Sequence, residues 1–240
     1  FLIMSMRKYN TISFDAADTL FYMPKGLGNS YYEVLKKYKT HHDPKAISKS
    51  FKKFFVNRKG LHFNGIKGDD LYIAEKSWWY DLVREIFTEL GMFDEFDKYF
   101  DELYEYFADE AWEVYPDTIE TLSRLKEANY NIVITSNFDS RIYRVCKKFY
   151  IDEFIDYYTI SSESGFSKPD KELFYMSLKK VNNKPSESVH VGDNYNLDYI
   201  PSFQIGMKSI LIDRENLFKN RTDICSSTDF AGIFEVLDEY

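Results

Sequence analysis

Seven polar side chains stand where strands are predicted to end or helices to begin, and together they could act on a phosphoryl group. In chain order they are Asp15, Asp18, Ser136, Asn137, Lys168, Asp193 and Asp198. Asp15 follows the strand-like run 11–14, and Asp193 comes just after the similar run 189–191. Because ligands of open α/β sheets bind beyond the carboxyl ends of the strands, we expect these two acids to converge there. A buried carboxylate in that place must be hydrogen-bonded, metal-bound or reactive, since an unpaired buried charge is costly.

The two acids suit a magnesium site. Asp15, Asp193 and the backbone carbonyl of Ala17, completed by water, offer the oxygen ligands that this hard cation prefers. Mg²⁺ would offset the charge of a phosphoryl group, so that Asp15 could attack phosphorus in line and form an aspartyl-phosphate that water later cleaves. Asp198 is expected to orient Lys168 or a metal-bound water instead of binding the ion itself.

Three further residues are candidates for binding the phosphoryl oxygens. Ser136 and the backbone around Asn137, which end the apolar run 132–135, would donate hydrogen bonds to them. Lys168 would add positive charge and keep Asp15 ionised. Simpler explanations stay open, because Ser136 and Asn137 could cap the helix that follows and Lys168 could be an ordinary loop lysine.

The order of acid, hydroxyl, lysine and acid pair resembles the four motifs of the haloacid dehalogenase-like superfamily. The matching stretches are 11–20, 132–137, 165–170 and 189–198. The runs 136–141 and 192–198 are similar to a branch of uncharacterised eukaryotic hydrolases with a helical cap. The resemblance implies a three-layer, Rossmann-like α/β core with a parallel sheet, an inserted α-helical cap, hydrolase activity and Mg²⁺ as cofactor.

One residue departs from the pattern of this superfamily. Its phosphatases normally carry a second acid two residues after the nucleophile, which protonates the leaving alkoxide and then activates water. Here that position is Ala17, and Asp18 stands one residue later, where glycine is usual. Losing a positioned general acid typically costs about 10²–10⁴-fold in rate. We therefore predict a slow or specialised phosphatase whose proton comes from Asp18, from a cap residue or from the substrate.

Two other functions fit the same residues. The first is a non-catalytic protein that binds a phosphoryl ligand. The second is hydrolysis of a C–P or C–halogen bond. Phosphonate hydrolases of the superfamily share alanine at the second position but need a cap lysine. Haloacid dehalogenases lack the metal, and the pair Asp193 and Asp198 argues against that activity.

The spacing of apolar residues indicates which elements position these groups. From 30 to 113 the apolar residues recur with a helical period, which predicts amphipathic helices. Elsewhere strands alternate with helices, which favours parallel βαβ units. We predict a core domain of residues 1–20 and 114–240 and a helical cap domain of residues 21–113. Residues 21–29 are rich in glycine and proline and are predicted to form a loop.

Charge divides the predicted cap into two halves. Residues 36–67 hold ten Lys and Arg against one acid, and residues 69–113 hold three against fifteen acids. The two halves could simply attract each other. Alternatively, Arg58, Lys59 and His62 could reach over the core and help to hold an anionic substrate.

Composition narrows the possible partners. The 240 residues carry a net charge of -8, which argues against general binding to nucleic acid or to a membrane surface. Cys146 and Cys225 lie far apart without metal-ligand spacing, which favours a reducing compartment and a cytoplasmic location. His190 lies inside a predicted strand and is interpreted as a core residue. The expected partner is a small phosphorylated molecule, because a closing cap leaves little room for a protein, and the expected state is a monomer or homodimer.

Overall fold

A six-stranded parallel sheet lies at the centre of the computed structural model, which describes residues 7–238. The strands, in spatial order, are β5 (Tyr157–Ile160), β4 (Asn131–Ser136), β1 (Thr11–Phe14), β6 (Ser188–Gly192), β7 (Lys208–Ile212) and β8 (Ser226–Ser227). Every neighbouring pair is parallel. Because β1 pairs with both β4 and β6, the carboxyl ends of these three strands lie side by side.

Helices cover both faces of this sheet and complete the predicted three-layer α/β core. They are α5 (Thr118–Glu127), α6 (Ile142–Lys148), α7 (Ser161–Ser164), α8 (Lys171–Lys180), α9 (Ile200–Gln204) and α10 (Ala231–Asp238), with the 3-10 helices η1 (Ile151–Glu153) and η2 (Pro185–Glu187) and the π-helix η3 (Tyr195–Tyr199). On one face, the ring of Phe174 in α8 lies 4.9 Å from that of His190. On the other, Phe14 lies 5.7 Å from Phe230, the residue before α10. The side chains of neighbouring strand residues thus alternate between two helical layers.

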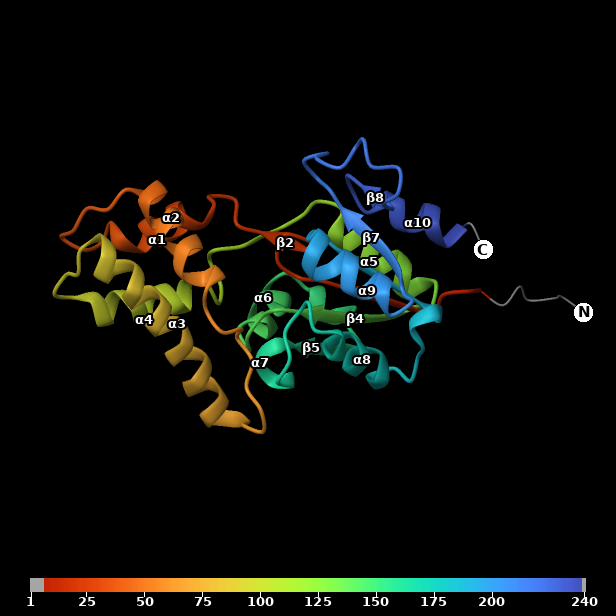
Figure 1. The fold of residues 1–240 in the computed structure, drawn as a ribbon, viewed down its shortest axis with the longest axis horizontal. Helices are drawn as coiled ribbons and strands as arrows, with labels where there is room; N and C mark the ends of the chain where they lie inside the picture. Colours follow the sequence, from red (N-terminus) through yellow and green to blue (C-terminus); the bar gives the residue numbers. More distant parts are fainter. Residues whose placement is uncertain (1–6, 239–240) are drawn as a thin grey trace, which may run out of the picture.

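Four helices form a second group beside the sheet. They are α1 (Leu27–Leu35), α2 (Pro44–Val56), α3 (Gly68–Leu90) and α4 (Phe96–Tyr106), and we call residues 27–106 the helical insert. The insert has its own buried cluster, which includes Tyr31, Phe87 and Tyr99. The chain enters it through β2 (Phe21–Tyr22) and returns through β3 (Glu113–Val114), and these two strands pair antiparallel. Figure 1 shows α1–α4 at one end of the molecule and the layered sheet at the other.

The segment 21–29 differs from its prediction as a loop. It begins with β2, and α1 already starts at Leu27. A Cβ on Gly28 would lie 1.9 Å from the carbonyl oxygen of Pro44, the first residue of α2. Gly28 therefore permits close contact between two helices and does not break α1. Gly26, with φ 70°, precedes the helix and does take a conformation that favours glycine.

Ion pairs join the basic and acidic halves of the insert. Lys37 Nζ lies 2.9 Å from a carboxylate oxygen of Glu102, and Lys53 Nζ lies 2.8 Å from one of Glu89. Attraction between the two halves of the insert therefore explains part of the separation of charge along the sequence. Among residues 7–238, no helix is both long enough and apolar enough to cross a membrane.

Candidate functional site

Asp15 lies at the carboxyl end of the central strand. Its backbone N–H donates to the carbonyl of Val191 in β6 at 2.9 Å, which continues the strand pairing by one residue. The residue is only 7% exposed. Ser136 ends the neighbouring strand β4. Burial raises the pKa of the Asp15 carboxyl, and the charge of Lys168 and the hydrogen bonds from Lys168 and Ser136 offset this rise only in part. Asp193 follows β6 on the other side. The structure thus brings together three residues that come from separate parts of the sequence.

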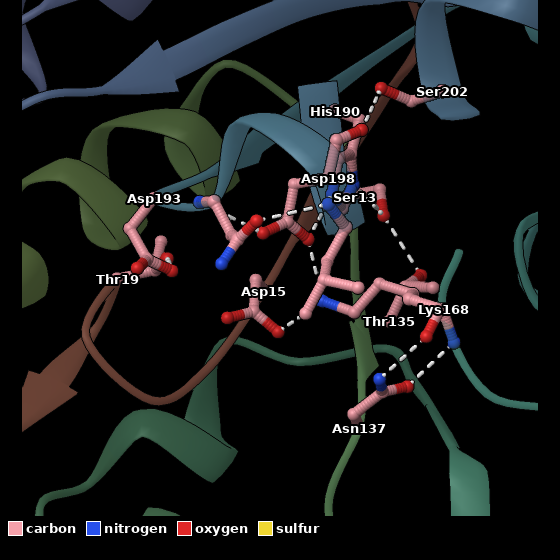
Figure 2. A network of polar contacts seen from close by, with 12 residues as sticks. Ser13, Asp15, Thr19, Thr135, Asn137, Lys168, His190, Asp193, Asp198 and Ser202 are labelled. Atoms are coloured by element: carbon pink, nitrogen blue, oxygen red, sulfur yellow. Dashed lines mark hydrogen bonds and ion pairs between the residues drawn. The ribbon is translucent and has the colours of Figure 1, made fainter. Parts of the chain in front are cut away.

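Lys168 reaches these acids from the loop before α8. The side chain of Asn137 holds its backbone, accepting from the Lys168 N–H at 2.7 Å and donating to the Lys168 carbonyl at 2.9 Å. The Nζ atom contacts Asp15 Oδ1 and lies 2.6 Å from Asp198 Oδ1. Figure 2 shows the lysine between these two acids. Burial disfavours the ammonium ion, but the charges of Asp15 and Asp198 outweigh it and raise the pKa of Lys168. Lys168 is therefore a fixed, buried cation.

Asp198 is the buried counter-ion of this lysine. Besides Lys168, its Oδ1 lies 3.1 Å from His190 Nε2, and its Oδ2 accepts the N–H of Asn194 at 3.1 Å. Burial alone would raise the pKa of Asp198, but Lys168 and His190 together lower it to about 2. A Cβ on Gly192 would lie 2.4 Å from Asp198 Cγ, so the glycine leaves room for this side chain at the end of β6.

His190 connects Asp198 to the central strand. Its Nδ1 lies 2.9 Å from Ser13 Oγ, which in turn lies 2.9 Å from Thr135 Oγ1 of β4. A ring that carries its proton on Nε2 donates to Asp198 and accepts from Ser13. His190 is 1% exposed, in agreement with its interpretation as a core residue. It also orients Asp198, and the sequence analysis missed this role.

Three carboxylates gather around the single lysine. Oxygens of Asp15, Asp193 and Asp198 lie within 4.8 Å of one another. Burial, with the charges of Asp15 and Asp198, raises the pKa of Asp193 to about 8. Thr19 donates to Asp193 Oδ1 at 3.3 Å, a long hydrogen bond. Since the oxygens of Asp198 are already engaged, Asp15 and Asp193 are the acids best able to accept a further cation. Their oxygen donors and excess negative charge fit a hard divalent ion.

The backbone turns sharply after Asp15. The carbonyl of Ala16 accepts the N–H of Leu20 at 2.8 Å. Asp18 has φ 62°, in the left-handed region that favours glycine. Ala17 lines the cavity above the site, whereas Asp18 is exposed. Desolvation of its carboxyl and the charge of Asp15 raise the pKa of Asp18. The one-residue shift of the second acid therefore gives the two side chains different surroundings.

A cavity of about 610 Å³ lies between the site lysine and the helical insert. Ala17, Asn137 and Lys168 line it on the side of the sheet, and side chains of α1–α4 line it on the other side. Its position next to Lys168 makes it the candidate space for an organic group attached to a bound phosphoryl group.

The loop between α2 and α3 crosses from the insert to this sheet end. His62 Nδ1 lies 3.1 Å from the hydroxyl of Ser167, the residue before the site lysine. Arg58 lines the cavity but pairs with Glu85 at 2.9 Å, and Lys59 is exposed. Of the three predicted cap candidates, only His62 contacts a residue adjacent to the site lysine.

Residues 9–202 match the family model described as haloacid dehalogenase-like hydrolase. The chain belongs to this hydrolase family. It is 27% identical over 218 residues to the haloacid dehalogenase-like hydrolase domain-containing protein 3 of Danio rerio, covering 89% of this chain and 88% of that protein. It is 30% identical over 131 residues to a glyceraldehyde 3-phosphate phosphatase of Methanothermobacter thermautotrophicus, covering 51% of this chain and 58% of that protein. Its fold matches the Bacillus subtilis hydrolase YfnB, solved bound to magnesium, with a TM-score of 0.73 at 13% identity, over 97% of this chain and 100% of that one.

In this haloacid dehalogenase-like hydrolase, a contact network that was not predicted from the sequence joins the insert to the loop after β4. Glu75 of α3 is fully buried and accepts the backbone N–H of Ser140 at 3.0 Å, as well as its hydroxyl. One turn along α3, Trp79 donates its indole N–H to Asp139 at 2.6 Å, and Arg141 pairs with the same carboxylate. Nothing in the acidic half of the insert distinguishes Glu75 from its exposed neighbours, so no local signal could have identified it.

Proposed function

We propose that this hydrolase is an Mg²⁺-dependent phosphatase that uses Asp15 as its nucleophile. The observation that carries the proposal is the buried Lys168 ammonium between Asp15 and Asp198, beside a further acid, Asp193 (Figure 2). Such fixed charges suit stabilisation of a phosphoryl group during transfer. The similarity to a glyceraldehyde 3-phosphate phosphatase and to a hydrolase solved with magnesium supports the same function.

Asp15, Asp193 and the backbone carbonyl of Ala17 would hold Mg²⁺. The ion, when bound, supplies positive charge that offsets the negative charge of the phosphoryl group. The proposal requires Asp15 to be ionised. Burial and the charge of Asp198 raise the pKa of Asp15, and the adjacent Lys168 ammonium, together with a bound cation, would oppose that rise.

The Asp15 carboxylate would attack phosphorus while the bond from phosphorus to the leaving oxygen breaks. Ser136 and backbone N–H groups near Asn137 would donate hydrogen bonds to the phosphoryl oxygens, and Lys168 would contribute its charge. Water would then cleave the aspartyl-phosphate and regenerate the Asp15 carboxylate. Asn137 has a second task, because both the nitrogen and the oxygen of its side-chain amide bind the backbone of Lys168.

Asp18 is our candidate for the proton donor to the leaving oxygen. Its raised pKa favours the protonated form that a general acid needs. Its backbone conformation and exposure differ from those of Ala17, so proton transfer from Asp18 is expected to be inefficient. Acyl and aryl phosphates, whose leaving groups need little protonation, should therefore be hydrolysed better than alkyl esters.

We further propose that residues 21–113 act as a cap over a core made of residues 1–20 and 114–240. The antiparallel pairing of β2 with β3 at the junction and the separate buried cluster of the insert support this division. The substrate would be a small phosphorylated molecule held in the cavity between the two parts.

A second candidate function is phosphoryl-ligand binding without turnover. The observation in its favour is the methyl group of Ala17, which stands at the cavity where a phosphatase of this family would carry an acid.

Hydrolysis of acetyl phosphate with and without Mg²⁺ separates the two functions. Mg²⁺-dependent turnover by the wild type that is lost in Asp15→Asn is the result expected of the phosphatase. A wild type without turnover, together with an active Ala17→Asp variant, would instead favour the binding protein. No turnover in either protein, with no Mg²⁺ binding detected by calorimetry, would overturn the proposed mechanism.

A further inference from the structure

The cavity beside the candidate site is lined mainly by apolar and aromatic side chains. Its volume of about 610 Å³ is typical of pockets that enclose organic molecules of roughly drug size. Among the lining residues of the insert are Tyr31, Phe51, Phe55, Trp78 and Leu103. An aromatic or aliphatic group would therefore bury much of its surface here.

The two arginines that line the cavity already have carboxylate partners. Arg141 places its Nε 2.9 Å from Asp139 Oδ1 and its Nη2 2.6 Å from Asp139 Oδ2. Arg58 Nη1 lies 2.9 Å from Glu85. Arg58 Nε and the hydroxyl of Tyr104 are buried without a hydrogen-bond partner among the described residues, so the apolar wall carries a small number of free polar groups. A substrate with many hydroxyls would leave them unpaired against the apolar wall, which is costly.

Trp79 forms a fixed part of this wall. Its Nε1 donates to Asp139 at 2.6 Å, and the guanidinium carbon of Arg141 lies 5.0 Å from its ring. Phe55 stacks on it at 6.4 Å between ring centroids, with 24° between the planes. A ring held on its edge by a buried carboxylate keeps one orientation, so Trp79 is a preformed aromatic part of the cavity wall.

We propose that, among phosphate esters of alcohols, those of apolar, aromatic alcohols are preferred, with Trp79 and Phe55 as specificity-determining residues. This inference rests on the proposed phosphatase function, since Lys168 would hold the phosphoryl group at the edge of the same cavity. It ranks sugar phosphates, whose many hydroxyls the apolar wall cannot pair, below these esters.

A matched pair of esters tests the preference. 2-Phenylethyl phosphate and glycerol 3-phosphate are both esters of primary alcohols, so their leaving groups differ little in intrinsic reactivity. Given the area of one ring, we expect kcat/KM to favour the phenylethyl ester by about 10²-fold. Equal or faster hydrolysis of glycerol 3-phosphate would overturn the inference, while Mg²⁺-dependent turnover of acetyl phosphate in the same assay would leave the proposed function standing.

A binding measurement covers the case in which no ester is hydrolysed. All three tryptophans of the chain, Trp78, Trp79 and Trp112, line the cavity, so intrinsic fluorescence reports its occupancy. We expect 2-phenylethylphosphonate to change the fluorescence at concentrations about 10²-fold lower than methylphosphonate does. Equal responses would overturn the inference whether or not the protein has phosphatase activity.

Two substitutions identify the cavity wall as the source of the preference. Phe55 is 43% exposed, so Phe55→Ala is compatible with folding, and it should reduce the phenylethyl-to-glycerol ratio by about tenfold. Phe203 of α9 is 61% exposed and does not line the cavity, so Phe203→Ala should leave the ratio unchanged. An unchanged ratio in Phe55→Ala would contradict the role assigned to that residue.

Discussion

The side chain of Asn137 holds the backbone of Lys168 through two hydrogen bonds. The Lys168 N–H donates to Asn137 Oδ1 at 2.7 Å, and Asn137 Nδ2 donates to the Lys168 carbonyl at 2.9 Å. A single amide at the end of β4 thereby fixes a loop 31 residues further along the chain. The Lys168 Nζ atom reaches Asp15 and Asp198 from this fixed backbone. The position of the cation therefore depends on the side-chain amide of Asn137.

Substitution of Asn137 should reduce activity more than stability. Asn137→Asp keeps an oxygen that accepts the Lys168 N–H. It replaces the donating nitrogen by a second oxygen, which would repel the Lys168 carbonyl oxygen, so the lysine should shift. We expect kcat on acetyl phosphate to fall by about 10²-fold and the free energy of unfolding to fall by about 1–2 kcal/mol. The exposed Asn57→Asp is the control. Wild-type kcat in Asn137→Asp would contradict the positioning role.

Removal of the Lys168 charge should destabilise the protein strongly. Lys168→Met leaves Asp15 and Asp198 buried without their cation, and such a loss typically costs about 3–5 kcal/mol. Urea unfolding measures the change, and the exposed Lys171→Met is the control. The double variant Lys168→Met with Asp198→Asn should recover part of the loss, because it removes one of the two unpaired charges. Wild-type stability in Lys168→Met would show that the ammonium does not hold these acids together.

Glu75 should make stability depend on pH. It is fully buried, and burial raises the pKa of Glu75 more than the hydrogen bonds from Ser140 lower it. Between the unfolded pKa of about 4.3 and the higher folded value, the folded state binds a proton that the unfolded state has released. The stability that protonation of Glu75 contributes is therefore complete below the unfolded pKa and is lost as the pH rises through the folded pKa.

Glu75→Gln removes this titration, so its free energy of unfolding relative to the wild type should increase as the pH rises above about 4.3. Urea unfolding at a series of pH values checks the direction. The exposed Glu110→Gln should run parallel to the wild type. A parallel curve for Glu75→Gln as well would show that this carboxyl stays ionised at the interface.

The convergence of Asp15, Ser136 and Asp193 could be predicted from sequence because each residue follows a visible strand pattern. Parallel pairing then places the three strand ends together without further information. The contact of His190 with Asp198 could not be predicted in the same way. It depends on the register that sets His190 opposite Ser13 and on a π-helix after β6, and neither leaves a periodic signal.

Gly28 shows the same limit in the insert. Glycine usually marks a turn, so a sequence rich in Gly and Pro predicts a loop. Here the missing Cβ serves packing against Pro44, which the chain reaches only sixteen positions later. A local pattern cannot show which segment will lie against a residue.

Gly28→Ala should therefore destabilise the insert. The new Cβ would meet backbone 1.9 Å away, so α1 and α2 must move apart. We expect a loss of about 1–3 kcal/mol in the free energy of unfolding, with a rise in KM because both helices line the cavity. Asn29→Ala, at the exposed neighbouring position of α1, should change stability little. Equal stability of Gly28→Ala and the wild type would contradict the close helix contact.

The family pattern favours an acid followed by a small residue. Here the small residue, Ala17, comes first and the acid, Asp18, follows. The left-handed position, φ 62°, carries a carboxyl, and the position that lines the cavity carries a methyl. In the double variant Ala17→Asp with Asp18→Gly, a carboxyl would enter the cavity and the left-handed position would gain the residue that suits it. The first change would supply a proton donor at the cavity, and the second would relieve the left-handed backbone next to it.

We expect this double variant to hydrolyse 2-phenylethyl phosphate about 10²–10⁴-fold faster than the wild type, because the leaving alkoxide requires a proton. Acetyl phosphate should gain much less, since its leaving carboxylate requires none. Asp18→Gly alone separates the two positions: loss of phenylethyl activity with acetyl phosphate turnover retained is the result expected if Asp18 is the natural proton donor. Equal loss on both substrates would assign Asp18 to another task. No gain in the double variant would show that position 17 does not reach the leaving oxygen, and the proton would then have to come from the insert or from the substrate.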